Sequence, residues 1–292
     1  MRKILVVAII ALLGASANLA AAAEPLVEPA WVKANAGRPG IVFVDLRFPR
    51  TFQAGHVPGA VRTSYGRDGW RVTRNGVPGM LPETAELEAL IGGLGIDNTS
   101  HVVLLPAGIS AGEVGSATRI YWTLKLLGHD EVSILNGGMR IYLRDKAAPL
   151  EQGPSRPRAK AFKARLRPEL LATAADVRRA LSDGTLLIDN RSNDKHLGIN
   201  TPRPVVTRAG TPPGAVSVPA VWLTEDAGGV FRDAATLRKL YAAAGAPSQG
   251  PAITFCNTGH WASLGWFVNS EILGNRQTRL YDGSMAEWSR DP

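Results

Sequence analysis

The sequence is nearly free of cysteine, because Cys256 is the only one among its 292 residues. A single thiol excludes an intramolecular disulfide, a Cys-x-x-Cys redox pair and a cysteine-based metal cluster. The five histidines lack the spacing of metal ligands, so we expect neither a metal nor a cofactor. Like charges form no long block despite the net charge of +8, which argues against a nucleic-acid partner.

Long hydrophobic runs are also absent, apart from one at the N-terminus. Arg2 and Lys3 precede an apolar run over residues 4–13, and small residues follow up to Ala23. The run is shorter than the roughly 20 residues that cross a bilayer. This pattern is typical of a secretory signal peptide over residues 1–23. We therefore expect cleavage, export to a bacterial periplasm and no stable membrane insertion of the mature chain.

The rest of the chain repeats itself at a period of about 145 residues. Each half contains an apolar strand ending in Asp-x-Arg, then a Pro-Gly turn, then a later strand and turn. The matched segments are 41–47 and 186–191, 55–61 and 210–216, and 132–138 and 278–283. Three matches in one order indicate duplication. We predict domains at 26–150 and 169–292, joined by an exposed linker at 151–168 that is rich in Pro, Lys and Arg.

Each half alternates between two kinds of segment. Apolar strands such as 102–105 and 252–255 alternate with helical stretches such as 116–127 and 263–273. That alternation predicts an α/β fold, with a parallel sheet flanked by helices on both faces in each domain. The hydrophobic content of 45% suffices for two such cores.

The most informative segment is the loop that starts at Cys256. The thiol follows the predicted strand 252–255, and a helix is expected to begin near Ala262. At the carboxyl ends of parallel strands, loop N–H groups and a helix N-terminus form an anion site, and the same donors stabilise a thiolate. A lone cysteine after an apolar run is more often a packing residue, but the polar loop favours a nucleophile. The candidate substrate-binding residues of the loop are Asn257, Thr258, Gly259, His260 and Trp261.

Taken together, these motifs resemble the rhodanese family of sulfurtransferases, specifically its exported tandem-domain members. The resemblance covers nearly the whole chain after residue 23. It rests on Asp45-x-Arg47, the 55–60 turn, Leu127-Gly128-His129 with 135–138, Asp189-x-Arg191, Cys256-x-x-Gly259, and 281–284 with Glu287-Trp288. It implies two tandem rhodanese-like domains. In the second, Cys256 would carry a persulfide between a small anionic sulfur donor and a thiol or cyanide acceptor.

The resemblance also implies different roles for the two halves. Pro106 stands where the first domain would carry the cysteine, which implies a domain without a nucleophile that packs against the second. For Asp45 and Arg47 we therefore expect a structural ion pair. Arg191 corresponds to an arginine that faces the active site in the family, so it is expected to bind the anionic donor.

The residues after Cys256 do not identify the donor. Thiosulfate-preferring members of the family usually carry cations there, whereas Asn257 and Thr258 are neutral. Mercaptopyruvate-preferring members have small neutral residues at these positions, but an exported enzyme would meet little of that cytoplasmic metabolite. The donor, the acceptor and any protein partner stay open at this point.

Other functions fit parts of the pattern. Cysteine-dependent phosphatases have related loops, but their Cys-x5-Arg motif would need an arginine where the chain has Ala262. A disulfide oxidoreductase would need a resolving cysteine. A periplasmic module that carries persulfide sulfur without turnover, or that binds an oxyanion and acts with a partner protein, is not separated from an enzyme by the sequence.

Overall fold

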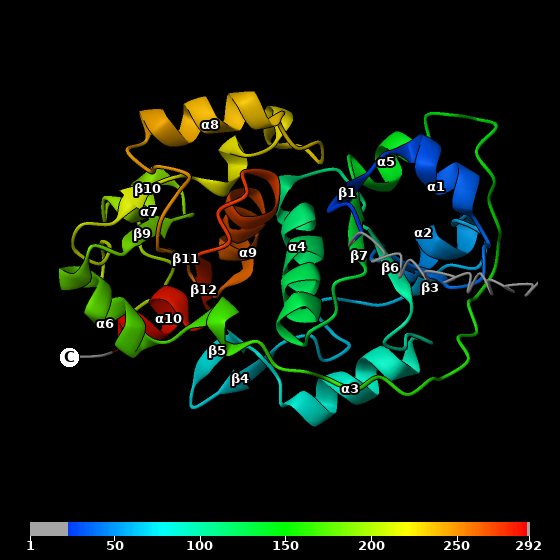
Figure 1. The fold of residues 1–292 in the computed structure, drawn as a ribbon, viewed down its shortest axis with the longest axis horizontal. Helices are drawn as coiled ribbons and strands as arrows, with labels where there is room; N and C mark the ends of the chain where they lie inside the picture. The colour runs from blue at the N-terminus through cyan, green and yellow to red at the C-terminus, as the bar shows by residue number, and fades with distance from the viewer. Residues whose placement is uncertain (1–22, 291–292) are drawn as a thin grey trace, which may run out of the picture.

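The computed structural model describes residues 23–290, so the predicted signal peptide lies outside the described residues except for Ala23. The chain forms two α/β domains that lie side by side, each built on a five-stranded sheet (Figure 1). Of the helices that the structure describes, none combines the length and the apolar character needed to cross a membrane.

The sheet of the first domain is parallel throughout and has the strand order β1-β7-β6-β2-β3. Its strands are β1 (Leu26–Val27), β2 (Ile41–Asp45), β3 (Val61–Arg62), β6 (His101–Leu105) and β7 (Val132–Leu135). Its helices are α1 (Pro29–Asn35), α2 (Pro49–Ala54), α3 (Thr84–Gly93), α4 (Ala111–Leu126) and α5 (Gly138–Tyr142). A small antiparallel hairpin, β4 (Val72–Arg74) and β5 (Val77–Met80), extends from this domain towards the second (Figure 1).

Alternation along these strands explains why helices cover both faces of the sheet. Val102 and Leu104 of β6 belong to the core that includes α3 and α4, whereas Val103 and Leu105 belong to the core that includes α1, α2 and α5. Successive side chains of a strand point to opposite faces. A strand that is apolar at every position must therefore be buried from both sides.

The second domain repeats this plan, with the parallel strand order β10-β9-β11-β12-β8. Its strands are β8 (Leu171–Ala172), β9 (Leu186–Asp189), β10 (Val216–Ser217), β11 (Ala252–Phe255) and β12 (Thr278–Tyr281). Its helices are α6 (Ala174–Asp183), α7 (Asn193–His196), α8 (Ala234–Ala243), α9 (His260–Trp266), which continues as π-helix to Ile272, and α10 (Ser284–Trp288). The predicted α/β class, with two sheets flanked by helices, is confirmed.

Most residues of the linker at 151–168 are exposed, and its second half is also bound to the first domain. It is extended, and the Lys160 and Arg165 N–H groups donate to the carbonyls of Gly92 and Leu127. Phe162 is only 2% exposed and joins the core of the first domain. The second half of the linker is therefore held along the first domain, as the trace at the bottom of Figure 1 shows.

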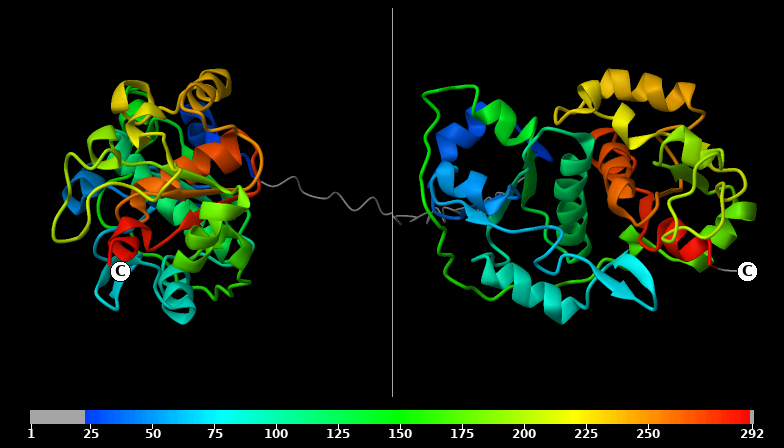
Figure 2. Two further views of the ribbon diagram at one scale, coloured as in Figure 1. Left: turned by 90° about the vertical axis from the view of Figure 1, so that its left-hand side faces the viewer. Right: turned by 180° about the vertical axis from the view of Figure 1, so that it is seen from behind.

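The two domains meet where α4 crosses α9 (Figure 2). Thr118 and Ser263 share a hydroxyl hydrogen bond of 2.9 Å, and the ring of Tyr121 meets Phe267 edge-on at 4.8 Å between centroids. Apolar residues of both helices belong to one buried cluster that continues across the boundary. Because this seam is a shared core, the two domains form one packed unit.

The Asp-x-Arg motifs end the equivalent strands β2 and β9 in the same way. Arg47 forms a two-pronged ion pair with Asp45 and donates to the Gly55 carbonyl at 2.8 Å. Arg191 does the same with Asp189 and with the Gly210 carbonyl at 2.9 Å. Both arginines are buried, with 6% and 1% of their surface exposed. Each pair ties the end of a central strand to a turn later in its domain.

We therefore expect Arg47→Ala and Arg191→Ala both to destabilise the protein. Each removes the guanidinium partner of a buried carboxylate, a loss that typically lowers the free energy of unfolding by about 3–5 kcal/mol. The decrease should be smaller for Arg191→Ala, because Asp189 keeps its hydrogen bonds with His196 and Thr211. Urea unfolding of the two variants measures this. A stable Arg191→Ala variant whose main defect is a raised KM for an anionic donor would contradict the structural assignment and favour donor binding instead.

Candidate active site

Cys256 lies at the carboxyl end of β11 and is 3% exposed. Its N–H donates to Ser284 Oγ at 3.1 Å, and the Gly259 N–H donates to the same oxygen at 3.0 Å. The carbonyls of Cys256 and Asn257 accept from the N–H groups of Met285 and Ala286, at 3.0 and 2.8 Å. The loop is thus fastened at both ends to the start of α10.

Strand register explains why the first domain has no equivalent nucleophile. Phe255 is paired with Asp189 across β11 and β9, and Leu105 is paired with Asp45 across β6 and β2. The residue after each of these positions is Cys256 in the second domain and Pro106 in the first. The two loops therefore occupy equivalent places, and only one of them carries a thiol.

Part of the catalytic loop, defined here as residues 256–261, has backbone donors that the protein does not use. The N–H groups of Asn257 and Thr258 have no acceptor among residues 23–290. Gly259 turns the chain with φ 72°, a conformation that favours glycine. The Trp261 side chain packs against the shared core. The loop can therefore offer N–H groups to an anion beside the thiol.

A buried arginine of the first domain reaches this loop. Arg119, on α4, is 1% exposed, donates from Nη1 to the Gly259 carbonyl at 3.2 Å and pairs through Nη2 with Asp282. The other carboxylate oxygen of Asp282 accepts from the N–H of Leu81, which follows the β4–β5 hairpin, at 2.7 Å. The first domain therefore binds the catalytic loop at Gly259 and binds Asp282 through both of its carboxylate oxygens.

The charge of Arg119 is maintained by its partner. Burial disfavours the charged guanidinium, but the neighbouring groups together, with the Asp282 carboxylate first among them, outweigh that effect, so that the pKa of Arg119 is raised. Arg119 was not among the predicted site residues. The signal that could have found it is a single guanidinium among Ala117, Ile120, Tyr121 and Trp122, in a helix whose residues are mostly buried.

His260 connects the catalytic loop to the first domain rather than to the thiol. Its Nε2–H donates to the Gly112 carbonyl at 2.9 Å, and its Nδ1 then accepts from the Tyr65 hydroxyl at 3.2 Å. The ring lies against Gly115, where an added Cβ would come within 2.8 Å of Nε2. Burial lowers the pKa of His260 to about 4, so that the ring is neutral at pH 7. Both ring nitrogens are engaged, which leaves neither for a proton transfer with Cys256.

The structure brings most of the predicted site residues together. The loop residues lie next to the thiol along the chain, whereas the guanidinium of Arg191 is bonded to Asp189 and to the Gly210 carbonyl. Its guanidinium carbon lies 6.0 Å from the ring centroid of Phe255, the residue before Cys256. Its role in donor binding stays a prediction.

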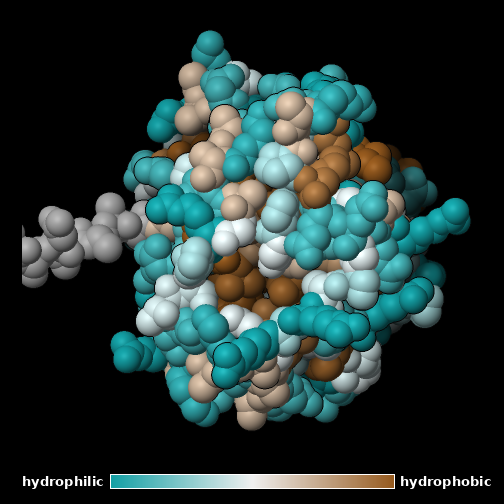
Figure 3. Space-filling model, turned by 90° about the vertical axis from the view of Figure 1, so that its right-hand side faces the viewer, coloured by the Kyte–Doolittle hydropathy of each residue, from teal (hydrophilic) through white to brown (hydrophobic). Residues whose placement is uncertain are grey.

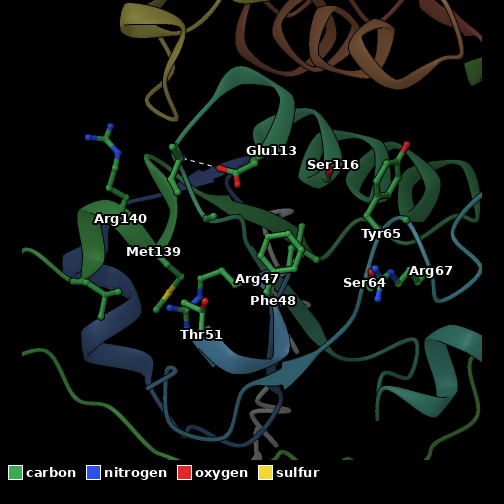
Figure 4. A pocket seen from close by; sticks show the side chains of 15 residues that line it. Arg47, Phe48, Thr51, Ser64, Tyr65, Arg67, Glu113, Ser116, Met139 and Arg140 are labelled. Atoms are coloured by element: carbon green, nitrogen blue, oxygen red, sulfur yellow. Dashed lines mark hydrogen bonds between the residues drawn. The ribbon is translucent and has the colours of Figure 1, made fainter. Parts of the chain in front are cut away.

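A cavity of about 650 Å³ lies in the first domain, at the carboxyl ends of β2, β3 and β6 (Figure 4). Apolar side chains such as Phe48 and Met139 line much of it, and Tyr65, the partner of His260, stands at its edge. On the face of the molecule that the first domain forms, hydrophobic side chains gather in a central hollow (Figure 3). No residue of the catalytic loop lines the 650 Å³ cavity, so the first domain contributes to the site through contacts rather than through this space.

The neutral state of His260 predicts a pH dependence of stability. The unfolded chain binds a proton at His260 below the ordinary pKa of 6.5, whereas the folded chain does so only near pH 4. Stability should therefore fall as the pH drops from 6.5 to 4, and His260→Gln should make that slope shallower by up to about 1.4 kcal/mol per pH unit. Urea unfolding at several pH values checks this, with pH 8 as the reference at which the ring is neutral in both states. Equal slopes in the two proteins would disprove it.

Comparison with known proteins agrees with the duplicated architecture. The Rhodanese-like domain matches the chain twice, over residues 28–145 and 173–291. The chain is 33% identical over 246 residues to a thiosulfate sulfurtransferase of Rattus norvegicus, covering 82% of this chain and 80% of that protein. It is 32% identical over 280 residues to a thiosulfate sulfurtransferase of Bos taurus, covering 90% and 91%.

Solved structures agree with the fold as well. A 3-mercaptopyruvate sulfotransferase of Escherichia coli, SseA, superposes with a TM-score of 0.75 at 25% identity, covering 90% of this chain and 99% of that one. The Tum1 protein of Saccharomyces cerevisiae gives a TM-score of 0.71 at 22% identity, covering 91% and 94%. Two matched domains and relatives aligned over most of their length lead to one conclusion: the chain belongs to the rhodanese-like family, as a tandem-domain sulfurtransferase.

Proposed function

We propose that this sulfurtransferase moves sulfane sulfur from a small anionic donor, such as thiosulfate or a related compound, to a thiol or cyanide acceptor through a persulfide on Cys256. One observation carries the proposal. The only thiol of the chain stands at the carboxyl end of a central parallel strand, in a loop whose Asn257 and Thr258 N–H groups have no acceptor in the part of the chain that the structure describes. Such donors stabilise an anion that forms or binds next to the thiol.

The proposed reaction balances without a cofactor. The Cys256 thiolate attacks the outer sulfur of the donor, a new S–S bond forms, and the donor's own bond to that sulfur breaks. With thiosulfate, sulfite leaves with the electron pair. An acceptor such as cyanide then attacks the outer persulfide sulfur, thiocyanate leaves, and the thiolate is restored. Unused loop N–H groups can hold the negative charge in both steps.

The charge around the loop bears on the choice of donor. Asn257 and Thr258 are neutral, and the nearby guanidinium of Arg119 is already paired with Asp282. A dianion such as thiosulfate therefore meets little unpaired positive charge beside Cys256, and long-range attraction contributes little to its capture. This supports a modest rate with thiosulfate compared with enzymes whose loop carries cations.

Where the protein works is a separate proposal. The pattern of residues 1–23 favours export to a bacterial periplasm. N-terminal sequencing of the protein from a periplasmic extract tests this. An N-terminus at Glu24 is the expected result, and an intact Met1 in the cytoplasmic fraction would contradict it.

The first prediction for the reaction concerns the thiol. Incubation with thiosulfate should add one sulfur atom to the protein, and cyanide should remove it, as read by intact mass. Cys256→Ser should unfold like the wild type but gain no sulfur and show no turnover. Turnover by that variant would end the persulfide mechanism. Loading of the wild type without turnover would instead favour the non-enzymatic carrier.

The second prediction concerns loop charge. Asn257→Arg should raise kcat/KM for thiosulfate because a cation beside the thiol attracts the dianion, and added salt should shrink the gain. Asn257→Met, which adds bulk without charge, is the matched control. A gain equal in both variants, or one that salt leaves unchanged, would show that loop charge does not set the rate.

A further inference from the structure

The inactive domain inserts a buried charge into the active one. Arg119 lies in the middle of α4, and its guanidinium contacts the carbonyls of Gly259 and Gly79 at 3.2 and 3.5 Å in addition to Asp282. It also stacks on Trp122, with its guanidinium carbon 4.7 Å from the ring centroid. Its Nε is buried without a partner. Burying a charged guanidinium in this way costs free energy of desolvation, which a residue used only for packing would not need.

Two bonds of Arg119 act on the geometry of the catalytic loop. The bond to the Gly259 carbonyl fixes the backbone of the residue directly after Asn257 and Thr258, whose N–H groups have no acceptor among residues 23–290. The pair with Asp282 holds the segment that leads into Ser284, whose hydroxyl accepts from the N–H of Cys256. An added Cβ on Gly259 would come within 2.4 Å of Arg119 Nη1, which shows how closely the guanidinium and the loop fit.

We propose that Arg119 is a positioning residue for sulfur transfer, through which the domain without a nucleophile holds the Cys256 loop in its reactive shape and places a positive charge near the sulfur. The inference rests on the proposed persulfide function. It gives the first domain a part in the chemistry of the second, beyond the shared core. Three guanidinium contacts and the unpaired Nε, all on a side chain that is 1% exposed, carry it.

The charged and titratable groups around the catalytic loop come from several elements. They are Arg119 on α4, Asp282 after β12, His260 in the loop, and Tyr65 and Arg71 between β3 and β4. His260 is neutral at pH 7, and the negative charge of Cys256 is among the influences that raise the pKa of Arg119. Arg119 and Asp282 therefore act on the sulfur with opposite signs.

Because the two charges have opposite signs, removing each of them distinguishes an electrostatic role of Arg119 from a purely structural one. The pH midpoint of Cys256 alkylation by iodoacetamide reports thiolate formation. Arg119→Met removes the cation, so the midpoint should rise by about one pH unit. Asp282→Asn removes the anion, so the midpoint should fall. Both variants loosen the same loop, and a structural effect alone would move both midpoints in the same direction. That result would overturn the proposal.

Measuring kcat/KM separates the effect of the positive charge of Arg119 from the effect of its contacts with the loop. Arg119→Lys keeps the charge but loses the forked contacts, so its midpoint should stay near that of the wild type while kcat/KM falls by about 10²-fold. Wild-type kcat/KM in this variant would contradict a positioning role. Arg47→Lys is the matched control, because Arg47 is buried against Asp45 in the same domain but makes none of the loop contacts. It should lose stability and keep both the midpoint and kcat/KM.

Two further measurements keep the outcome clear. If Arg119→Met does not fold, the Arg119→Met/Asp282→Asn double variant leaves no unpaired buried charge and should fold with the same loss of kcat/KM. Wild-type turnover in the double variant would refute the proposal. Sulfur loading of the wild type, read by intact mass, is measured alongside. Failure to load refutes the persulfide function itself, whereas normal loading with unaffected Arg119 variants refutes only this inference.

Discussion

The packing of α4 against α9 is the contact on which the rest of the structure depends. It joins two separate sheets into one core through Thr118, Ser263, Tyr121 and Phe267. It also brings the first turns of α4 next to the catalytic loop, where the Gly112 carbonyl accepts from His260 and Gly115 leaves room for its ring. Any larger residue at Gly115 would force that ring, and with it the loop, to shift. The active site is therefore a consequence of how the domains pack.

The two domains share a scaffold and differ in chemistry. Both end a central strand with a buried Asp-x-Arg pair that ties the strand to a glycine carbonyl, at Gly55 and at Gly210. This pair serves the fold in either domain, since it occurs with and without a neighbouring thiol. The difference lies in the next strand, where Cys256 and Pro106 occupy equivalent places. The two domains thus retain the same scaffold, and the domain without a thiol contacts the loop of the other domain.

The electrostatics of the site follow from the same interface. The first domain supplies a cation, Arg119, whose burial is offset by Asp282, and a hydroxyl, from Tyr65, that occupies one nitrogen of His260. Burial makes the histidine neutral and leaves the arginine charged, because only the arginine has a carboxylate partner. The net result is a loop with few unpaired charges beside its thiol, in which backbone N–H groups are the donors nearest to Cys256 in the chain.

Most of the fold and one part of the site could be predicted from the sequence. Apolar strands that alternate with helical stretches predicted the α/β class, the repeated Asp-x-Arg and Pro-Gly motifs predicted the duplication, and a lone cysteine after a buried strand indicated the candidate nucleophile. These are local signals, because the pattern of neighbouring residues indicates whether a strand is buried and where a loop begins. Arg119, Tyr65 and the engagement of His260 were not predictable in this way. They reach the loop from about 140 to 195 positions away, and only the packing of one domain on the other brings them there. Local patterns were therefore enough to single out Cys256 as the candidate sulfur carrier. The residues that contact its loop depend on how one domain packs on the other, and that geometry is not recorded in any local pattern.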